Sequence, residues 1–345
     1  MALRDEHDLP WLAAPLQALR DHERGHALIL HGRAGSGLFE LALRVAQAWL
    51  CEQPPGPCGV CPGCHLTLAR SHPDLKVLMP ETLQQAIGWN AGGDSEGDAG
   101  DGDSKARKKP SREIKVEAVR QAIDWAHTSS GRGRGKVLVL NPADAMNAVA
   151  ANALLKTLEE PAAGVRLLLC VDDPERLLPT IRSRCQRVRL PAPSEAEALQ
   201  WLGGQGVKDP AVLLRASGGE PLSALALGAE GLTAESWAAL PGQVAAGDSR
   251  VLAALPPARV VHVLQQICHD AMAAAAGAPP RYFPTGSLQA GADWAALAEW
   301  SRTLARTARH DEHPWNAGLL IESLVSQGTV ALNAGPAAHK AGRYT

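Results

Sequence analysis

The sequence has little net charge, only −2, because 34 Lys and Arg residues nearly balance 36 Asp and Glu residues. No global positive field therefore draws the chain onto nucleic acid, which excludes a basic DNA-coating protein. It also lacks any apolar run near the roughly 18 residues that a membrane span requires. Charges stand near the N-terminus where a secretory signal would have its apolar region. The composition predicts a cytoplasmic protein without membrane contact.

Cysteine is scarce, at seven residues in 345, and four of the seven lie between Cys51 and Cys64. An odd number with such clustering is typical of a metal site in a reducing compartment rather than of a disulfide framework. The length suits two or three domains, and the 46% hydrophobic content is enough for at least one sizeable core.

Short apolar runs alternate with stretches of helical spacing over the first half of the chain. This alternation predicts a parallel α/β sheet with helices on both faces. The predicted strands are residues 27–30, 74–79, 136–140 and 165–171, and the main helices between them are residues 38–50 and 148–160. From a capping box at Ser194 and Glu197 to about residue 333, only helical patterns occur.

Residues 91–111 contain Gly, Asp, Ser and Lys with hardly an apolar side chain. Such a segment cannot bury enough surface to offset its ordering entropy, so we expect a disordered insertion. Its basic second half is either a DNA-touching patch or, as is commoner, part of a charge-balanced surface loop.

Gly32, Gly35 and Gly37 form a glycine loop with the spacing of a phosphate-binding loop, after a predicted strand and before a predicted helix. Backbone N–H groups of such a loop converge on an anion. However, Leu38 stands where the phosphate-binding lysine belongs, and Phe39 replaces the hydroxyl that holds Mg²⁺. We expect weak anion binding at most and no phosphoryl transfer.

A second nucleotide element is also missing. An active ATPase of this type ends its next buried strand in Asp-Glu, whereas here Leu140 is followed by Asn141 and Pro142. Two degenerate elements in the correct order favour a nucleotide-binding fold that no longer hydrolyses ATP. A glycine turn that arises by coincidence is the less favoured interpretation.

Cys51, Cys58, Cys61 and Cys64 place four thiols within fourteen residues. Four sulfur ligands close a tetrahedral shell, which predicts a structural Zn²⁺. Disulfides and an iron–sulfur cluster are the weaker interpretations. A base-reading finger is disfavoured because the nearest downstream basic residue is Arg70.

Four arginines lie in eight residues from Arg182 to Arg189. On spacing alone these are most often a solvated face. An arginine supplied to a neighbouring nucleotide is the alternative, since its guanidinium stays charged and binds phosphate bidentately.

The degenerate glycine loop, the four cysteines, residues 152–161 (NALLKTLEEP) and Ser183-Arg184-Cys185 together resemble the delta-prime subunits of the bacterial DNA polymerase III clamp loader, which are AAA+ proteins. The resemblance implies that Arg184 in this triplet is an arginine finger acting on ATP in an adjacent motor subunit. It further implies a rigid, non-hydrolysing stator in a pentameric ring with tau or gamma and delta subunits. Through that ring the chain would act on a sliding clamp and on primer-template DNA.

The resemblance also implies a domain plan. An AAA+ α/β domain carrying the cysteine module occupies residues 1–191, a helical lid residues 192–238, a helical collar residues 239–333, and a loose tail residues 334–345. Pro221 stands near the position of the lid arginine that active relatives aim at nucleotide. On the helix before Pro161, Lys156 and Glu159 are predicted to be exposed, serving either a subunit interface or solubility.

Two alternatives stay open. One is an active clamp-loader motor of the tau or gamma kind, which Leu38, Phe39, Asn141 and Pro142 disfavour. The other is a stand-alone zinc-ribbon protein that binds nucleic acid without partners.

Overall fold

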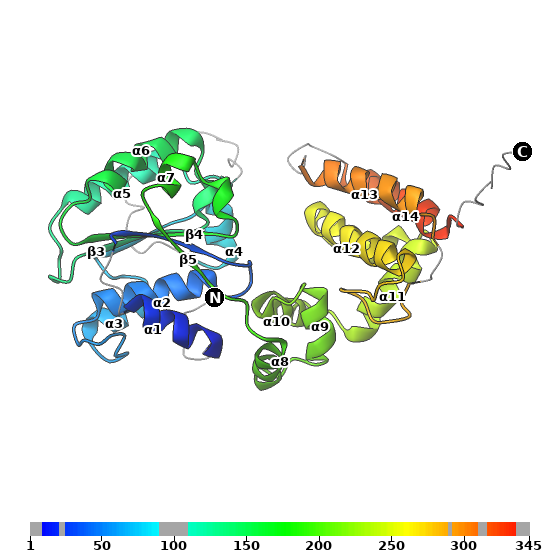
Figure 1. Cartoon of the computed structure of the whole chain (residues 1–345), viewed down its shortest axis with the longest axis horizontal. Helices are drawn as coiled ribbons and strands as arrows, with labels where there is room; N and C mark the ends of the chain where they lie inside the picture. The colour runs from blue at the N-terminus through cyan, green and yellow to red at the C-terminus, as the bar shows by residue number, and fades with distance from the viewer. Residues whose placement is uncertain (1–8, 21–24, 90–109, 289–291, 310–315, 336–345) are drawn as a thin grey trace, which may run out of the picture. The chain divides into compact units, whose positions relative to one another are not determined.

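The computed structural model describes residues 9–20, 25–89, 110–288, 292–309 and 316–335 (Figure 1). Contacts divide the chain into two compact units, residues 1–197 and 198–345, and each is described by itself. Among the described residues, no helix is long and apolar enough to cross a membrane.

The first unit is built on five parallel strands in the order β2-β3-β4-β1-β5. The strands are β1 (Ala27–His31), β2 (Leu75–Leu78), β3 (Lys136–Leu140), β4 (Val165–Val171) and β5 (Gln186–Arg189). β1, β3 and β4 are almost wholly buried, which explains why their sequences read as continuous apolar runs.

Helices cover both faces of this sheet (Figure 1). Ile29, Leu138 and Leu167 pack in one core with Val119 and Leu154 of the helices on one face. That face carries α5 (Val116–His127), α6 (Ala148–Glu159) and α7 (Pro179–Arg182); the other carries η2 (Pro10–Leu12), α1 (Ala13–Arg20), α2 (Leu38–Leu50) and α3 (Pro62–Leu68). A further short helix, α4 (Glu81–Ala86), follows β2. The predicted α/β class is confirmed.

The four predicted strands are present, but the edge strand β5 was not predicted. Its sequence Gln-Arg-Val-Arg has one apolar residue, Val188, because an edge strand with exposed side chains needs few. Most of the predicted disordered insertion, residues 91–109, lies outside the described residues. At its end, the backbone N–H of Ser111 donates to Glu81 at 2.9 Å.

The second unit contains helices, as predicted, and no strand among its described residues. They begin with α8 (Glu195–Gly204), whose first turn precedes the boundary between the units. The others are α9 (Pro210–Ala216), α10 (Pro221–Ala229), α11 (Ala234–Ala245), η5 (Ser249–Leu252), α12 (Pro257–Ala275), α13 (Trp294–Arg309) and α14 (Ala317–Asn333). Its core stacks Trp237 on Phe283, with ring centroids 4.5 Å apart. The buried carboxylate of Asp270 accepts backbone N–H bonds from Arg281, Tyr282 and Phe283, which fixes the loop after α12.

The capping box at the start of α8 is formed. The Glu197 N–H donates to the Ser194 hydroxyl, and the Ser194 N–H donates to the Glu197 carboxylate at 2.9 Å. Pro221 is the buried first residue of α10, so its side chain fills a structural position.

Candidate functional site

The glycine loop connects β1 to α2, where the sequence predicts it. Gly35 and Gly37 have positive φ angles of 69° and 93°, which side-chain-bearing residues rarely adopt. A Cβ at Gly32 would lie 3.0 Å from the carbonyl oxygen of Leu190, so the close approach there also needs glycine. The loop has the backbone turn of a phosphate site.

The positions that would supply charge and metal to this loop are packed apolar residues. Leu38 is only 7% exposed. Phe39 makes an edge-on contact with Trp89 in a small core, with ring centroids 5.5 Å apart. Leu38 and Phe39 are therefore part of the packing.

The segment before α1 also packs on the glycine loop. The indole N–H of Trp11 donates to the Ser36 carbonyl at 2.8 Å. A Cβ at Gly37 would lie 2.7 Å from Cδ1 of Leu9. After β3, Asn141 donates its backbone N–H to Leu78. Neither Asn141 nor Pro142 provides the carboxylate that a magnesium ion would need.

The four cysteines come together at the other end of α2. Cys51 follows the helix directly, and Cys61 caps α3 by accepting the N–H of Cys64 at 3.4 Å. All four sulfurs lie within 4.8 Å of one another. The Cys51–Cys61 and Cys58–Cys64 pairs are each 3.9 Å apart. Since a tetrahedron with 2.3 Å metal–sulfur bonds has sulfurs about 3.8 Å apart, the arrangement fits a metal such as zinc.

The same distances exclude disulfides within the cluster, because bonded sulfurs lie about 2.05 Å apart. Burial opposes ionisation of the Cys61 thiol, but the backbone N–H groups of Glu52 and Cys64 outweigh it and lower its pKa to about 6. Burial raises the pKa of Cys64, and the nearby sulfurs of Cys61 and Cys51 add to the effect. A bound cation would relieve this crowding of thiolate charge.

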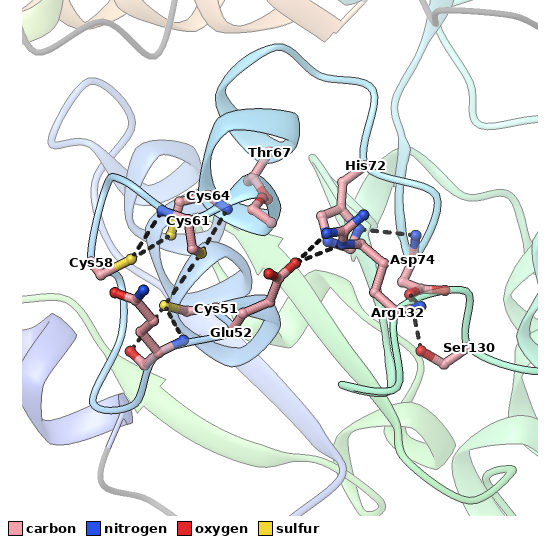
Figure 2. A network of polar contacts seen from close by, with 12 residues as sticks. Cys51, Glu52, Cys58, Cys61, Cys64, Thr67, His72, Asp74, Ser130 and Arg132 are labelled. Atoms are coloured by element: carbon pink, nitrogen blue, oxygen red, sulfur yellow. Dashed lines mark hydrogen bonds and ion pairs between the residues drawn. The ribbon is translucent and has the colours of Figure 1, made fainter.

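A network of polar contacts connects the cysteine loop to the loop that precedes β3 (Figure 2). Glu52, next to Cys51, accepts from Nε of Arg132 at 2.7 Å. The backbone N–H groups of Gly131 and Arg132 donate to the buried Asp74 at 2.8 and 2.9 Å. Ser130 donates to the same carboxylate at 2.9 Å. The cysteine loop is thus held against the loop that precedes β3.

Arg184 lies between α7 and β5, at the amino end of the edge strand. Its Nε donates to Glu159 of α6 at 2.8 Å, and its Nη2 pairs with the same oxygen. Its Nη1 donates to the Thr180 carbonyl at 2.9 Å and to the Ser183 hydroxyl at 3.2 Å. The Arg184 side chain is one-third exposed in this position. Burial raises the pKa of Cys185 to about 12, so its thiol stays neutral.

These predicted site residues do not form one site. β5 runs parallel to β1, with Leu28 opposite Gln186 and His31 opposite Arg189. Arg184 precedes β5, whereas the glycine loop follows β1, so they lie at opposite ends of the sheet. The thirteen residues of α2 separate the glycine loop from the cysteines by about 20 Å.

Sequence reasoning placed Glu159 on an exposed face but missed its contact with Arg184. Residues 25 positions apart on different elements carry no signal of contact in a single sequence. The exposed position itself is confirmed, since the Glu159 side chain is 49% exposed.

Comparisons with known proteins agree with the resemblance. Residues 14–194 match the family model described as DNA polymerase III, delta subunit. DNA polymerase III subunit delta' of Pseudomonas aeruginosa is 38% identical over 65% of this chain and 62% of its own length. The Escherichia coli K12 subunit delta' is 34% identical over 77% of this chain and 74% of its own length. The chain thus covers less than two thirds of the length of the Pseudomonas aeruginosa relative.

Subunit tau of DNA polymerase III from Salmonella typhimurium is also similar, at 32% identity over 54% of this chain and 24% of its own length. Its match is shorter than that of either delta' relative. The chain belongs to the DNA polymerase III subunit delta' family.

Proposed function

We propose that this chain is a non-hydrolysing subunit of a clamp loader, which helps to load a sliding clamp onto primed DNA. Its partners would be the tau or gamma and delta subunits of a pentameric ring. Arg184 of the Ser183-Arg184-Cys185 triplet would complete the ATP site of a neighbouring motor subunit.

The opposite placement of Arg184 and the glycine loop carries this proposal. The four residues of β5 alone span about 13 Å, more than an arginine side chain can bridge. Arg184 therefore acts on a nucleotide held by another subunit or on none. Glu159 and Thr180 hold the guanidinium at the surface, where a neighbouring subunit can meet it.

The cysteine cluster would hold a structural Zn²⁺ through Cys51, Cys58, Cys61 and Cys64. Four sulfur donors leave no position for water or substrate, so the ion would order the loop and take no part in hydrolysis. We further assign residues 192–238 as the lid and residues 239–333 as the collar of this family.

Substitution of Arg184 tests the proposed finger. In an assembly reconstituted with tau and delta subunits, Arg184→Ala should slow hydrolysis at the contacted ATP site by on the order of 10³-fold. The fold and metal content should not change. Arg187→Ala is the matched control, because Arg187 is an exposed β5 arginine paired with Glu175 at 3.3 Å. Equal ATP turnover by the two variants would remove the finger role.

The two alternatives make different predictions. An active motor would hydrolyse ATP without partners. A zinc-ribbon nucleic-acid binder would hold DNA alone, with an affinity that falls steeply with salt and disappears when the metal is removed. Packed Leu38 and Phe39 argue against the first, and a cysteine loop without Lys or Arg argues against the second.

A further inference from the structure

A cleft of about 710 Å³ opens at the amino ends of β3 and β4, beside the cysteine loop. Arg20, Arg134 and Arg166 line it, together with Trp49 and several glycines and prolines. No acidic side chain lines it among the residues that the structure describes. This cleft is separate from the glycine loop and from Arg184, and neither role proposed above uses it.

Two of its arginines have no counter-charge within the described chain. Arg132, two residues before Arg134, is neutralised by Glu52. In contrast, no ion pair joins Arg134 or Arg166 to any described acidic residue. Burial, and then the charge of Arg134, lowers the pKa of Arg166. The two like charges thus lie close enough to repel each other.

Arg166 is held in place by an aromatic ring. Its guanidinium lies over Trp49 of α2, 4.8 Å from the ring centroid, and Trp49 is only 8% exposed. A stacked guanidinium keeps its N–H donors at its edge, free to meet an anion. Because the ring is already covered, we expect no base stacking on Trp49.

Four of the residues that line the cleft are glycines, so part of its lining is backbone: Gly56, Gly133, Gly135 and Gly164. A Cβ at Gly135 would lie 2.3 Å from the carbonyl oxygen of Gly164, so only glycine fits there. Gly56 of the cysteine loop is equally constrained, with a Cβ placed 2.5 Å from that of Cys51. The cysteine loop thereby folds back on α2 and brings Pro54 and Pro55 to the cleft.

We propose that this cleft binds a phosphate group, carried by a nucleic-acid backbone or by a free nucleotide. A tetrahedral phosphate offers oxygens in several directions and can accept from Arg134 and Arg166 at once. A carboxylate has two oxygens in one plane and would satisfy one guanidinium bidentately. The separation of the arginines onto different elements therefore favours phosphate over an acidic peptide.

Binding measurements on the full-length chain with its metal test this proposal. The probes are inorganic phosphate, ATP without Mg²⁺, and a fluorescein-labelled twelve-nucleotide oligothymidine, followed by calorimetry or fluorescence anisotropy at low salt. The double variant Arg134→Ala/Arg166→Ala should weaken binding of phosphate by about tenfold or more. Arg120→Ala/Arg187→Ala is the control, because it also removes two positive charges, from exposed positions on α5 and β5.

The pattern of loss identifies the source of the phosphate. Loss of oligothymidine affinity points to a nucleic-acid backbone, and loss of ATP affinity alone points to a free nucleotide. Either result supports the cleft, provided that thermal unfolding shows the double variant to be folded. If it is not folded, Arg134→Ala alone, at an exposed position, serves instead.

Three results would overturn the proposal: no binding of any probe, equal affinities in the variant and the control, or binding of a glutamate-rich peptide in place of all three phosphate probes. None of these outcomes depends on Arg184. If phosphate binding at the cleft is disproved, the proposed role of Arg184 is unaffected. If the role of Arg184 is disproved, the proposed phosphate binding at the cleft is likewise unaffected.

Discussion

The two ends of α2 differ in what their loops can still hold. At the N-terminal end, the glycine loop keeps its turn, but Leu38 and Phe39 are packed and Trp11 bonds to Ser36. At the C-terminal end, four sulfurs face one another within 4.8 Å, with backbone N–H donors around them. One end has the backbone of a ligand site without its charged side chains, and the other has a complete donor set.

This difference shows that a loop can keep the backbone turn of a ligand site while it lacks the side chains that would bind the ligand. A loop of the correct shape persists because β1, α2 and Leu190 pack around it. Leu38 and Phe39 stand where an active phosphate-binding loop has its lysine and its hydroxyl, and both pack within the fold without disturbing it. Asn141 and Pro142 likewise stand where an active ATPase has its carboxylates. The cysteines cannot be replaced in this way, since the loop from Cys51 to Cys64 contains no large apolar residue except the exposed Val60.

Loss of a cysteine should produce the largest effect. Cys64→Ser removes a fully buried sulfur of the proposed metal site, so we expect the variant to bind no metal and to unfold at a markedly lower temperature. A structural zinc contributes about 10 kcal/mol or more to the folding of small zinc domains. Metal analysis and thermal unfolding measure both effects.

Cys268→Ala is the control for this variant. Cys268 is buried in α12 of the second unit, outside the cluster, so its loss should leave the metal content unchanged. A Cys64→Ser protein that keeps its full metal content would show that the four sulfurs are not the ligands.

Restoring the lysine at the glycine loop should have the next largest effect, and it should be unfavourable. Leu38→Lys places an ammonium at a position that is 7% exposed, which should lower the free energy of unfolding by about 2 to 4 kcal/mol. Urea titration measures this change. We also expect no ATP turnover, because Phe39 still provides no hydroxyl and Asn141 no carboxylate for a magnesium ion. If Leu38→Lys alone produced magnesium-dependent hydrolysis, the glycine-loop end of α2 would lack only its lysine, contrary to the difference described between the two ends.

We expect the smallest effects from replacing one glycine of each loop by alanine. Gly37 and Gly59 have positive φ angles of 93° and 73°, so alanine is strained at both. Only at Gly37 would the new Cβ also meet a packed side chain, Leu9, at 2.7 Å, whereas at Gly59 nothing lies within 4 Å. We expect Gly37→Ala to cost about 2 kcal/mol and Gly59→Ala about 1 kcal/mol in urea unfolding. The reverse order would show that Leu9 does not pack on the glycine loop.

Much of the fold could be predicted from the sequence because its signals are local. The buried strands are continuous apolar runs, and the cysteine spacing brings four thiols around one tight turn. The glycine loop lies at the predicted strand-to-helix junction. The missing lysine and carboxylates are visible as Leu38, Phe39 and Asn141 without any coordinates.

The remaining features depend on contacts between distant residues. β5 was missed because its edge position requires one apolar residue, and its pairing with β1 joins segments about 160 positions apart. The contact of Glu159 with Arg184 and the cleft lined by Arg134 and Arg166 arise where separate elements meet. In sequence, Glu159, Arg134 and Arg166 are ordinary surface charges, and nothing links Glu159 to Arg184.

We propose that this chain keeps the scaffold of an ATPase but not its chemistry, and that it acts on ATP held by another subunit. The most direct test is ATP hydrolysis by the purified full-length chain alone, with Mg²⁺ and saturating ATP. We predict no turnover above the protein-free background. Turnover that co-elutes with the chain and stops when Mg²⁺ is chelated would show that the chain hydrolyses ATP by itself.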